Sequence, residues 1–240
     1  MGPHSSTFRV RFDECAADGA VRAPVLLRYT IETAFAHSAR EGFPLSWYDE
    51  HGLYWLVRRA HLDLQRSVPY GGEVTVTTEV VGFRRIWARR RNIIRSRSGD
   101  PVGEITMDWI FTDRDGQPAR IVPEMERAFP GRAAPFRVER LDLGEVPPGA
   151  SVADYIVPGH QADPRGHMST AGYLDLFEDA LHGARVDTQG RPAVYEIEFL
   201  QQSLPGEVLH RRLWSSAGAW MMSVSTPEGI EVSRALRKST

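Results

Sequence analysis

The feature that most constrains the fold of this chain is an internal repeat. The segment QRSVPYGGEV at residues 65–74 returns as QQSLPGEV at residues 201–208, where six of the eight residues of the shorter copy are identical. Self-similarity of this kind indicates a duplicated structural unit. Each copy lies between stretches of alternating apolar and polar residues, so each turn is predicted to join two antiparallel strands, with two residues deleted from the second turn.

A helix is predicted ahead of these strands in each half. In residues 24–41, one stripe of the helix is formed by Leu27, Ile31, Ala34 and Ser38. The second helix, predicted over residues 169–182, has a matching stripe of Tyr173, Phe177 and Ala180, with Ala184 just beyond its end. Aligning the two helices pairs Glu178 with Glu32. Apolar residues at this spacing predict a helix buried along one side.

The two halves follow one plan, in which a strand, a helix and a run of antiparallel strands succeed one another. We predict an N-terminal repeat over residues 1–126 and a C-terminal repeat over residues 151–240. Residues 127–150 are rich in Pro and Gly and show no sustained period, so they are predicted to be a linker that crosses the surface. The fold class is therefore α+β, built from two tandem repeats of a long helix and an antiparallel sheet.

Composition narrows the classes of partner and compartment. The 29 basic and 31 acidic residues give a formal charge of −2, which argues against nucleic acid and membrane partners. The single cysteine, Cys15, excludes an internal disulfide framework and favours a reducing, cytoplasmic location. Because the sequence has no phosphate-binding Gly-rich loop and no metal-ligand cluster, we expect no metal and no tightly bound cofactor.

Chemistry is concentrated in front of the second helix, where ADPRGHMSTAGYLDLFEDAL at residues 162–181 places Asp163, Gly166 and His167 together. A helix N-terminus offers free backbone N–H groups to an oxygen that gains negative charge. A carboxylate just ahead of it can deprotonate water or attack a carbonyl carbon itself, and Gly166 would let the backbone approach a ligand closely. This combination suits thioester hydrolysis.

The alternative is that Asp163 only caps a turn, since Asp-Pro-x-Gly is a common turn sequence. The first half argues against this reading. There the counterpart of Asp163 is Ala16 or Ala17, and the counterpart of His167 is Ala20 or Val21. The first copy therefore keeps the helix but lacks the acid and the imidazole at these positions, and Asp18, one or two residues out of register, is the evidence on the other side.

The segment DPRGHMSTAGYLDLFEDA and the duplicated plan together resemble the hotdog-fold thioesterases, and within them the double-hotdog acyl-acyl-carrier-protein thioesterases. The resemblance implies that each sheet wraps around its helix and that one active site lies at the second helix entrance. The family pattern Asp-x-Asn-x-His is represented here by Asp163, Arg165 and His167. Gln202 stands where the family carries a Glu, and it can hold a water but cannot accept a proton as a carboxylate does.

The roles implied are Asp163 as base or nucleophile and His167 as a group that orients the carbonyl or protonates the leaving thiolate. The helical acid Glu178 is the reserve base. Candidate substrate-binding residues are Gly166, Tyr173 and Ser203, with Tyr54, Trp55 and more weakly Tyr48 from the aromatic segment at residues 43–55.

The segment RRIWARRRNIIRSR at residues 84–97 carries seven arginines. Strand alternation predicts that some of them form a solvated outer face. The alternative is docking of an acidic acyl carrier protein, or of coenzyme A phosphates, with Arg84, Arg85, Arg89 and Arg91 as the candidates for the carrier protein.

Two rival functions remain open at this point. As a separate expectation, the chain could assemble as a homodimer of double hotdogs. Hotdog dehydratases and hydratases resemble the chain in fold, but their Asp-to-His spacing is five residues, against four from Asp163 to His167. A non-catalytic acyl-carrier-binding protein is the second rival, suggested by the changed positions Arg165 and Gln202.

Overall fold

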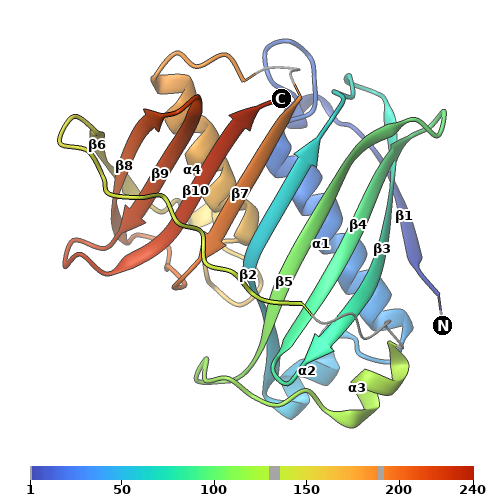
Figure 1. The fold of residues 1–240 in the computed structure, drawn as a ribbon. Coiled ribbons are helices and arrows are strands. Elements are labelled where there is room, and N and C mark those ends of the chain that lie inside the picture. The colour runs from blue at the N-terminus through green and yellow to red at the C-terminus, as the bar shows by residue number, and fades with distance from the viewer. Residues whose placement is uncertain (1, 130–135, 189–191) are drawn as a thin grey trace.

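The computed structural model describes residues 2–129, 136–188 and 192–240, and its strands form one antiparallel sheet (Figure 1). The first half contributes β1 (His4–Arg9), α1 (Ala23–Arg40), α2 (Leu45–His51), β2 (Leu53–Leu64), β3 (Glu73–Arg84), β4 (Trp87–Ser96), β5 (Pro101–Asp113) and α3 (Pro123–Ala128). The second half contributes β6 (Ser151–Ile156), α4 (Thr170–Gly183), β7 (Ala193–Phe199), β8 (Val208–Ser216), β9 (Ala219–Ser225) and β10 (Glu231–Ser239).

The strand order shows the duplication directly. It runs β1-β3-β4-β5-β2 through the first half and returns as β7-β10-β9-β8-β6 through the second. The two halves join where β2 pairs with β7, from Arg59 opposite Glu198 to Leu64 opposite Ala193. The sheet is therefore continuous, and the predicted double hotdog is confirmed.

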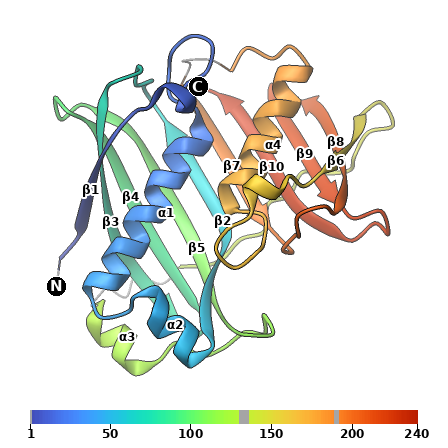
Figure 2. The ribbon, with the colours of Figure 1, turned by 180° about the vertical axis from the view of Figure 1, so that it is seen from behind.

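Both long helices lie on the same face of this sheet, side by side (Figure 2). Leu27 and Ala34 of α1 and Tyr173 and Phe177 of α4 are buried in the shared core, as the stripes predict. Ala184 departs from the prediction because it follows the end of α4 and is exposed. The two helices and the sheet together enclose one apolar core that draws on both halves.

The repeated turns differ from the sequence-based alignment. The strands that each turn connects are antiparallel in direction but not adjacent, since β4 and β5 lie between β2 and β3. Equivalent hydrogen bonds run from Val21 N to Val68 O and from Met168 N to Ser203 O, both 2.8 Å. Ser203 therefore corresponds to Val68 in the structure, whereas the identical letters align it with Ser67. The two-residue deletion inferred from those letters is wrong.

The segment between the halves crosses the opposite face of the sheet, away from the helices (Figure 1). The Leu141 N–H donates to Glu198 Oε2 at 3.2 Å, and Arg234 Nη1 donates to the Leu141 carbonyl at 2.9 Å. The Leu141 side chain is buried in a cluster with Trp214 and Met221. The predicted linker is thus held on the sheet around Leu141, whereas its first residues, 127–128, belong to α3 and its residues 130–135 lie outside the described residues.

Candidate active site

The loops that enter α1 and α4 have the same backbone design. A bridge joins Cys15 to Val21 in the first loop and Ala162 to Met168 in the second. This correspondence pairs Asp163 with Ala16 and His167 with Ala20, which decides between the two registers left open by the sequence. At the middle of the loops, Gly19 and Gly166 have φ of 78° and 82°, a left-handed conformation that favours glycine.

The carboxylate of Asp163 is held by the backbone of its own loop. Asp163 Oδ1 accepts hydrogen bonds from the N–H groups of Arg165 at 2.9 Å and His167 at 3.1 Å. The first loop closes without an acid at Ala16, because Asp18 Oδ1 accepts from the Ala20 N–H at 2.9 Å instead. The equivalent N–H groups of Ala20 and His167 are thus each bound by an Asp carboxylate, and the two loops supply this carboxylate from different positions. The second oxygen of Asp163, Oδ2, accepts no hydrogen bond from the described residues.

Asp163 lines a groove of about 1360 Å³ that is formed by residues of both halves. Three of the four predicted catalytic residues meet in it, namely Asp163, Arg165 and Gln202. Gln202 is exposed at the groove wall, and Tyr173, which donates its hydroxyl to the Gln201 carbonyl at 3.4 Å, lies nearby.

Arg165 connects the loop to the first half of the chain. Its guanidinium lies 3.8 Å from the centroid of the Tyr54 ring, and Tyr54 belongs to β2. The next residue, Trp55, lines the groove. Tyr54 is thus a support for the loop, and Trp55 forms part of the groove wall.

The other predicted residues do not line the groove in the described structure. Ser203 is fully buried, and its carbonyl accepts the Met168 N–H. A Cβ at Gly166 would meet no atom within 4 Å, so the glycine serves its positive φ and not a close approach. His167 is partly buried, and its Nδ1 is buried without a hydrogen-bond partner among the described residues.

The N-terminus of α4 opens onto the same groove. Ser169 caps the helix by accepting from the Gly172 N–H at 3.2 Å. Thr170 and Ala171 line the groove, and among the described residues no acceptor pairs with their backbone N–H groups. These two donors suit an oxygen that becomes negatively charged during the reaction.

A second carboxylate, Glu178, lies farther along α4. Burial raises its pKa to about 7, partly offset by the Tyr195 hydroxyl, which donates to Glu178 Oε1 at 3.2 Å. Arg237 Nε in turn donates to the Tyr195 oxygen at 3.2 Å. Glu178 lines both the groove and a smaller pocket of about 60 Å³ at the α1 entrance. Sequence reasoning kept it only in reserve, because an acid on a mixed helix usually faces solvent.

An apolar pocket inside the first half lies next to the groove. Phe35, Trp55 and Trp109 line both cavities, so these three side chains lie between them. Beyond them the wall is mainly apolar and includes Val80, Phe83, Met125 and Phe129, with Tyr48 from α2. Arg90 also lines this pocket, and the sequence analysis did not single it out. The one available signal was strand alternation, which places Arg90 on the inward face of β4.

Two further properties concern the described part of the chain. No group of three or more His, Cys, Asp or Glu side chains there is arranged to hold a metal ion. Within the same residues, no helix has both the length and the apolar character needed to cross a membrane.

Comparison of the fold with solved structures finds likeness over almost the whole chain. An oleoyl thioesterase structure from Lactobacillus plantarum matches with a TM-score of 0.87 and 18% identity, covering 99% of this chain and 96% of that one. The 12:0-ACP thioesterase from Umbellularia californica matches with a TM-score of 0.81 and 17% identity, covering 99% and 97%. An acyl-ACP thioesterase from Bacteroides thetaiotaomicron matches with a TM-score of 0.84 and 17% identity, covering 99% of this chain and 98% of that one.

The sequence itself gives the family. A search of curated proteins returns no match. The family model for the acyl-ACP thioesterase N-terminal domain matches residues 3–129, which is more than half of the 240 residues. Together with the duplicated hotdog and the groove at the α4 entrance, this match shows that the chain belongs to the acyl-ACP thioesterase family and is a thioester hydrolase.

Proposed function

We propose that the enzyme releases a fatty or polyketide-like acyl chain from an acyl carrier protein, with its reacting groups at the entrance of α4. The observation that carries the proposal is the setting of Asp163. Two backbone N–H groups fix one carboxylate oxygen, the other oxygen has no partner among the described residues, and the side chain lines the groove.

In this mechanism the thioester carbonyl oxygen lies at the Thr170 and Ala171 N–H groups. Asp163 either removes a proton from the attacking water or attacks the carbonyl carbon itself, in which case water then hydrolyses the mixed anhydride. The carbon–sulfur bond breaks as the tetrahedral intermediate collapses, and the thiolate takes up a proton. Gln202 would hold the water by hydrogen bonds. His167 does not line the groove, so its side chain would have to turn toward the substrate to orient the carbonyl or supply the proton to sulfur.

The two halves then divide the work. Residues 151–240 supply the reacting groups, residues 1–126 supply the apolar pocket for the acyl chain, and residues 127–150 join them. The chain would lie along the groove past Trp55, and only its end would enter the pocket of about 30 Å³ beyond Phe35 and Trp109, which line both cavities. Burial of a hydrocarbon chain there would be favourable by about 0.8 kcal/mol for each methylene group.

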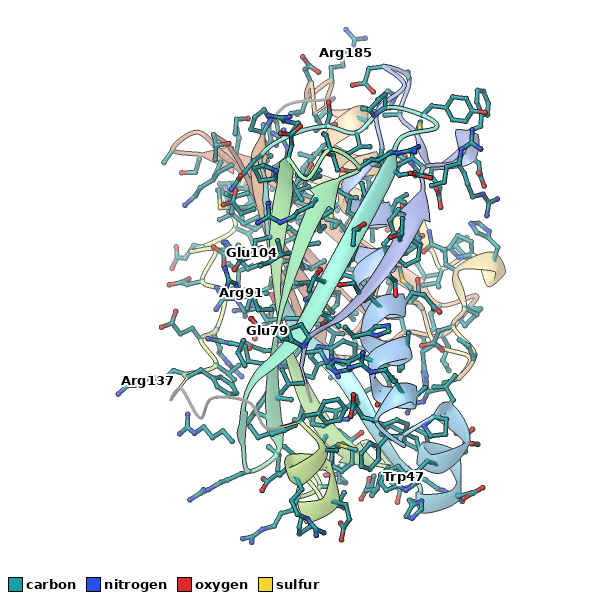
Figure 3. All side chains as sticks on the ribbon, turned by 90° about the vertical axis from the view of Figure 1, so that its right-hand side faces the viewer. Trp47, Glu79, Arg91, Glu104, Arg137 and Arg185 are labelled. Carbon is teal, nitrogen blue, oxygen red and sulfur yellow. The ribbon has the colours of Figure 1, made fainter. Side chains whose placement is uncertain are left out.

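Docking of the acidic carrier protein is proposed through Arg84, Arg85, Arg89 and Arg91. Figure 3 shows Arg91 beside Glu79 and Glu104, and its Nη2 lies 2.8 Å from Glu104 Oε2. Arg89 is paired with Asp108 through two hydrogen bonds of 2.6 and 2.8 Å. Arg84 and Arg85 are exposed at the β3–β4 turn and make no ion pair with a described residue, so we expect them to contribute most of the attraction.

Replacing Arg84 and Arg85 by Ser should raise KM for a carrier-bound substrate at low salt while leaving a short synthetic thioester unaffected. The matched double variant at Arg89 and Arg91 should have a smaller effect on KM, because those charges are already neutralised by carboxylates. Equal losses on both substrates would show damage to the fold instead of a lost docking surface.

The proposal extends to location and assembly. We place the enzyme in the cytoplasm, supported by its single free cysteine, Cys15. A homodimer of double hotdogs is proposed as its assembly, which light scattering on the purified protein would test.

The function itself is tested with a panel of acyl thioesters on carrier protein and on coenzyme A, using a reagent that detects the freed thiol. We expect hydrolysis by the parent enzyme and a loss of about 10² to 10⁴ in rate for Asp163→Asn, which keeps the size of the side chain but neither attacks nor accepts a proton. If Asp163→Asn matches the parent while Glu178→Gln is inactive, the fold is right and the base is Glu178. If the parent hydrolyses no thioester, the proposed function is wrong.

A further inference from the structure

The apolar pocket of the first half contains a charged residue that the hydrolysis mechanism does not use. Arg90 lies on β4, on the face that α1 covers, and only 8% of its surface is exposed. An ionised side chain in such a place is normally paired with an opposite charge, because burying an unpaired charge is costly. Its surroundings therefore show what the pocket is built to receive.

The partners of Arg90 in the described structure are neutral. Its Nη1 contacts His37 Nδ1 at 3.2 Å and donates to Thr78 Oγ1 at 3.4 Å. Burial, together with the nearby Arg90 charge, lowers the pKa of His37 to about 3, so the imidazole is uncharged at neutral pH. Since arginine can only donate, His37 Nδ1 must be the acceptor, and its Nε2 proton then faces Glu41 Oε1 at 3.7 Å.

The rest of the guanidinium is available to a ligand. No described residue accepts a hydrogen bond from Nε or Nη2 of Arg90, and no described carboxylate forms an ion pair with it. The Phe129 ring lies 5.4 Å from the guanidinium carbon, which supports the group without satisfying its donors. The positive charge and its free donors thus remain at the wall of the pocket.

The rest of the pocket wall restricts which group can reach this charge. Apart from Arg90, the lining is mostly aliphatic and aromatic, and Phe35 and Trp109 are shared with the lining of the neighbouring groove. The space inside is about 30 Å³, enough for a group of the size of a carboxylate or about two waters. A plain methyl end would leave the arginine buried and unpaired.

We propose that this enzyme selects acyl chains whose end remote from the thioester carries a hydrogen-bond acceptor, best a carboxylate, and that Arg90 binds this end. The inference rests on the proposed function, because the acyl chain must enter from the groove. A keto or hydroxyl end shares the accepting chemistry, but without the charge it should bind more weakly.

The direct test compares kcat/KM for coenzyme A thioesters in matched pairs, methyl-ended and carboxyl-ended at each chain length from six to twelve carbons. We expect the parent enzyme to prefer the carboxyl-ended member of the best pair by about tenfold or more, with keto-ended chains between. Arg90→Met should lose that preference, whereas Arg90→Lys should keep part of it. Arg95→Gln is the matched control, because Arg95 lies on the same strand but is exposed, and it should behave as the parent.

The parent preference decides the matter even if Arg90→Met fails to fold. A parent enzyme that prefers methyl-ended chains, or an Arg90→Met variant that loses activity equally on both series, would overturn the inference. Calorimetric binding of free diacids and matched monoacids separates it from the proposed function. Arg90-dependent diacid binding without any hydrolysis would keep the site and reject the activity, whereas hydrolysis without diacid selectivity would do the reverse.

Discussion

The Arg165 guanidinium lies 3.8 Å from the centre of the Tyr54 ring, so the loop that carries Asp163 in the second hotdog is braced on β2, the strand through which the first hotdog joins the second. Arg165 occupies the position where the family pattern has Asn, and it reaches across the groove wall to make this contact. A cation over an aromatic face contributes about 0.5–1 kcal/mol at an exposed site. The contact links the position of Asp163 to the other half of the chain.

Loosening this contact should impair the reaction more than it impairs the fold. We expect Tyr54→Leu to lower kcat by roughly threefold to tenfold, because the groups on the loop lose part of their alignment. The free energy of unfolding should fall by no more than about 1 kcal/mol. Tyr70→Leu is the control, since Tyr70 is an exposed tyrosine whose ring makes an edge-to-face contact with Phe12 and with no other ring among the described residues. A Tyr54→Leu, Arg165→Ala double variant that is no slower than either single variant would confirm that the two residues act together.

The other polar groups at the α4 entrance should matter less than Asp163. We expect Gln202→Ala to cost about tenfold in kcat/KM, because the amide only positions water, and His167→Ala to fall between Gln202→Ala and Asp163→Asn. Steady-state kinetics with one soluble thioester rank the three variants. A His167→Ala enzyme as fast as the parent would remove the imidazole from the mechanism.

The duplication and the two helices could be predicted from sequence because they depend on patterns that repeat along the chain. The register of the repeat could not be read from identical letters. Ser203 is the same residue type as Ser67, yet its backbone hydrogen bond makes it the structural equivalent of Val68. Equivalent positions in the two halves are set by backbone hydrogen bonds and not by side-chain identity. The same limit left Asp163 with two possible counterparts until the loop bridges paired it with Ala16.

Burial of charged groups was the main thing that sequence could not predict. Arg90 belongs to an arginine-rich strand, and its neighbours Arg89 and Arg91 point outward as alternation predicts. Only the tertiary structure shows that the inward position of Arg90 lies at a pocket. Glu178 is similar, because its surroundings come from Tyr195 on β7 and from the α1 entrance, which are distant in sequence.

The segment that crosses the outer face of the sheet should contribute to stability. Leu141 is only 5% exposed and packs with Trp214 and Met221, so Leu141→Ala should lower the free energy of unfolding by about 2–4 kcal/mol. Val146→Ala in the same segment is the control, because Val146 is exposed, and it should change stability by less than about 0.5 kcal/mol. Urea denaturation measures both. Equal stabilities for the two variants would mean that this segment is only a tether.

The last prediction concerns the raised pKa of Glu178, which links protonation to folding. Its carboxyl has a pKa of about 7 in the folded protein and 4.5 as its ordinary value, so between these pH values the folded state holds a proton that the unfolded state has released. Stability from this group is therefore fully present below pH 4.5 and is lost as the pH rises to about 7. At about 1.4 kcal/mol for each pH unit, the loss amounts to at most roughly 3 kcal/mol.

Glu178→Gln cannot titrate, so the difference in free energy of unfolding between the variant and the parent should shift in favour of the variant from pH 5 to pH 8. Urea denaturation at several pH values tests this, and Glu32→Gln, at an exposed acid on α1, should leave the pH dependence of the parent unchanged. Parallel pH profiles for the parent and Glu178→Gln would show that Glu178 is ionised in the folded protein at neutral pH.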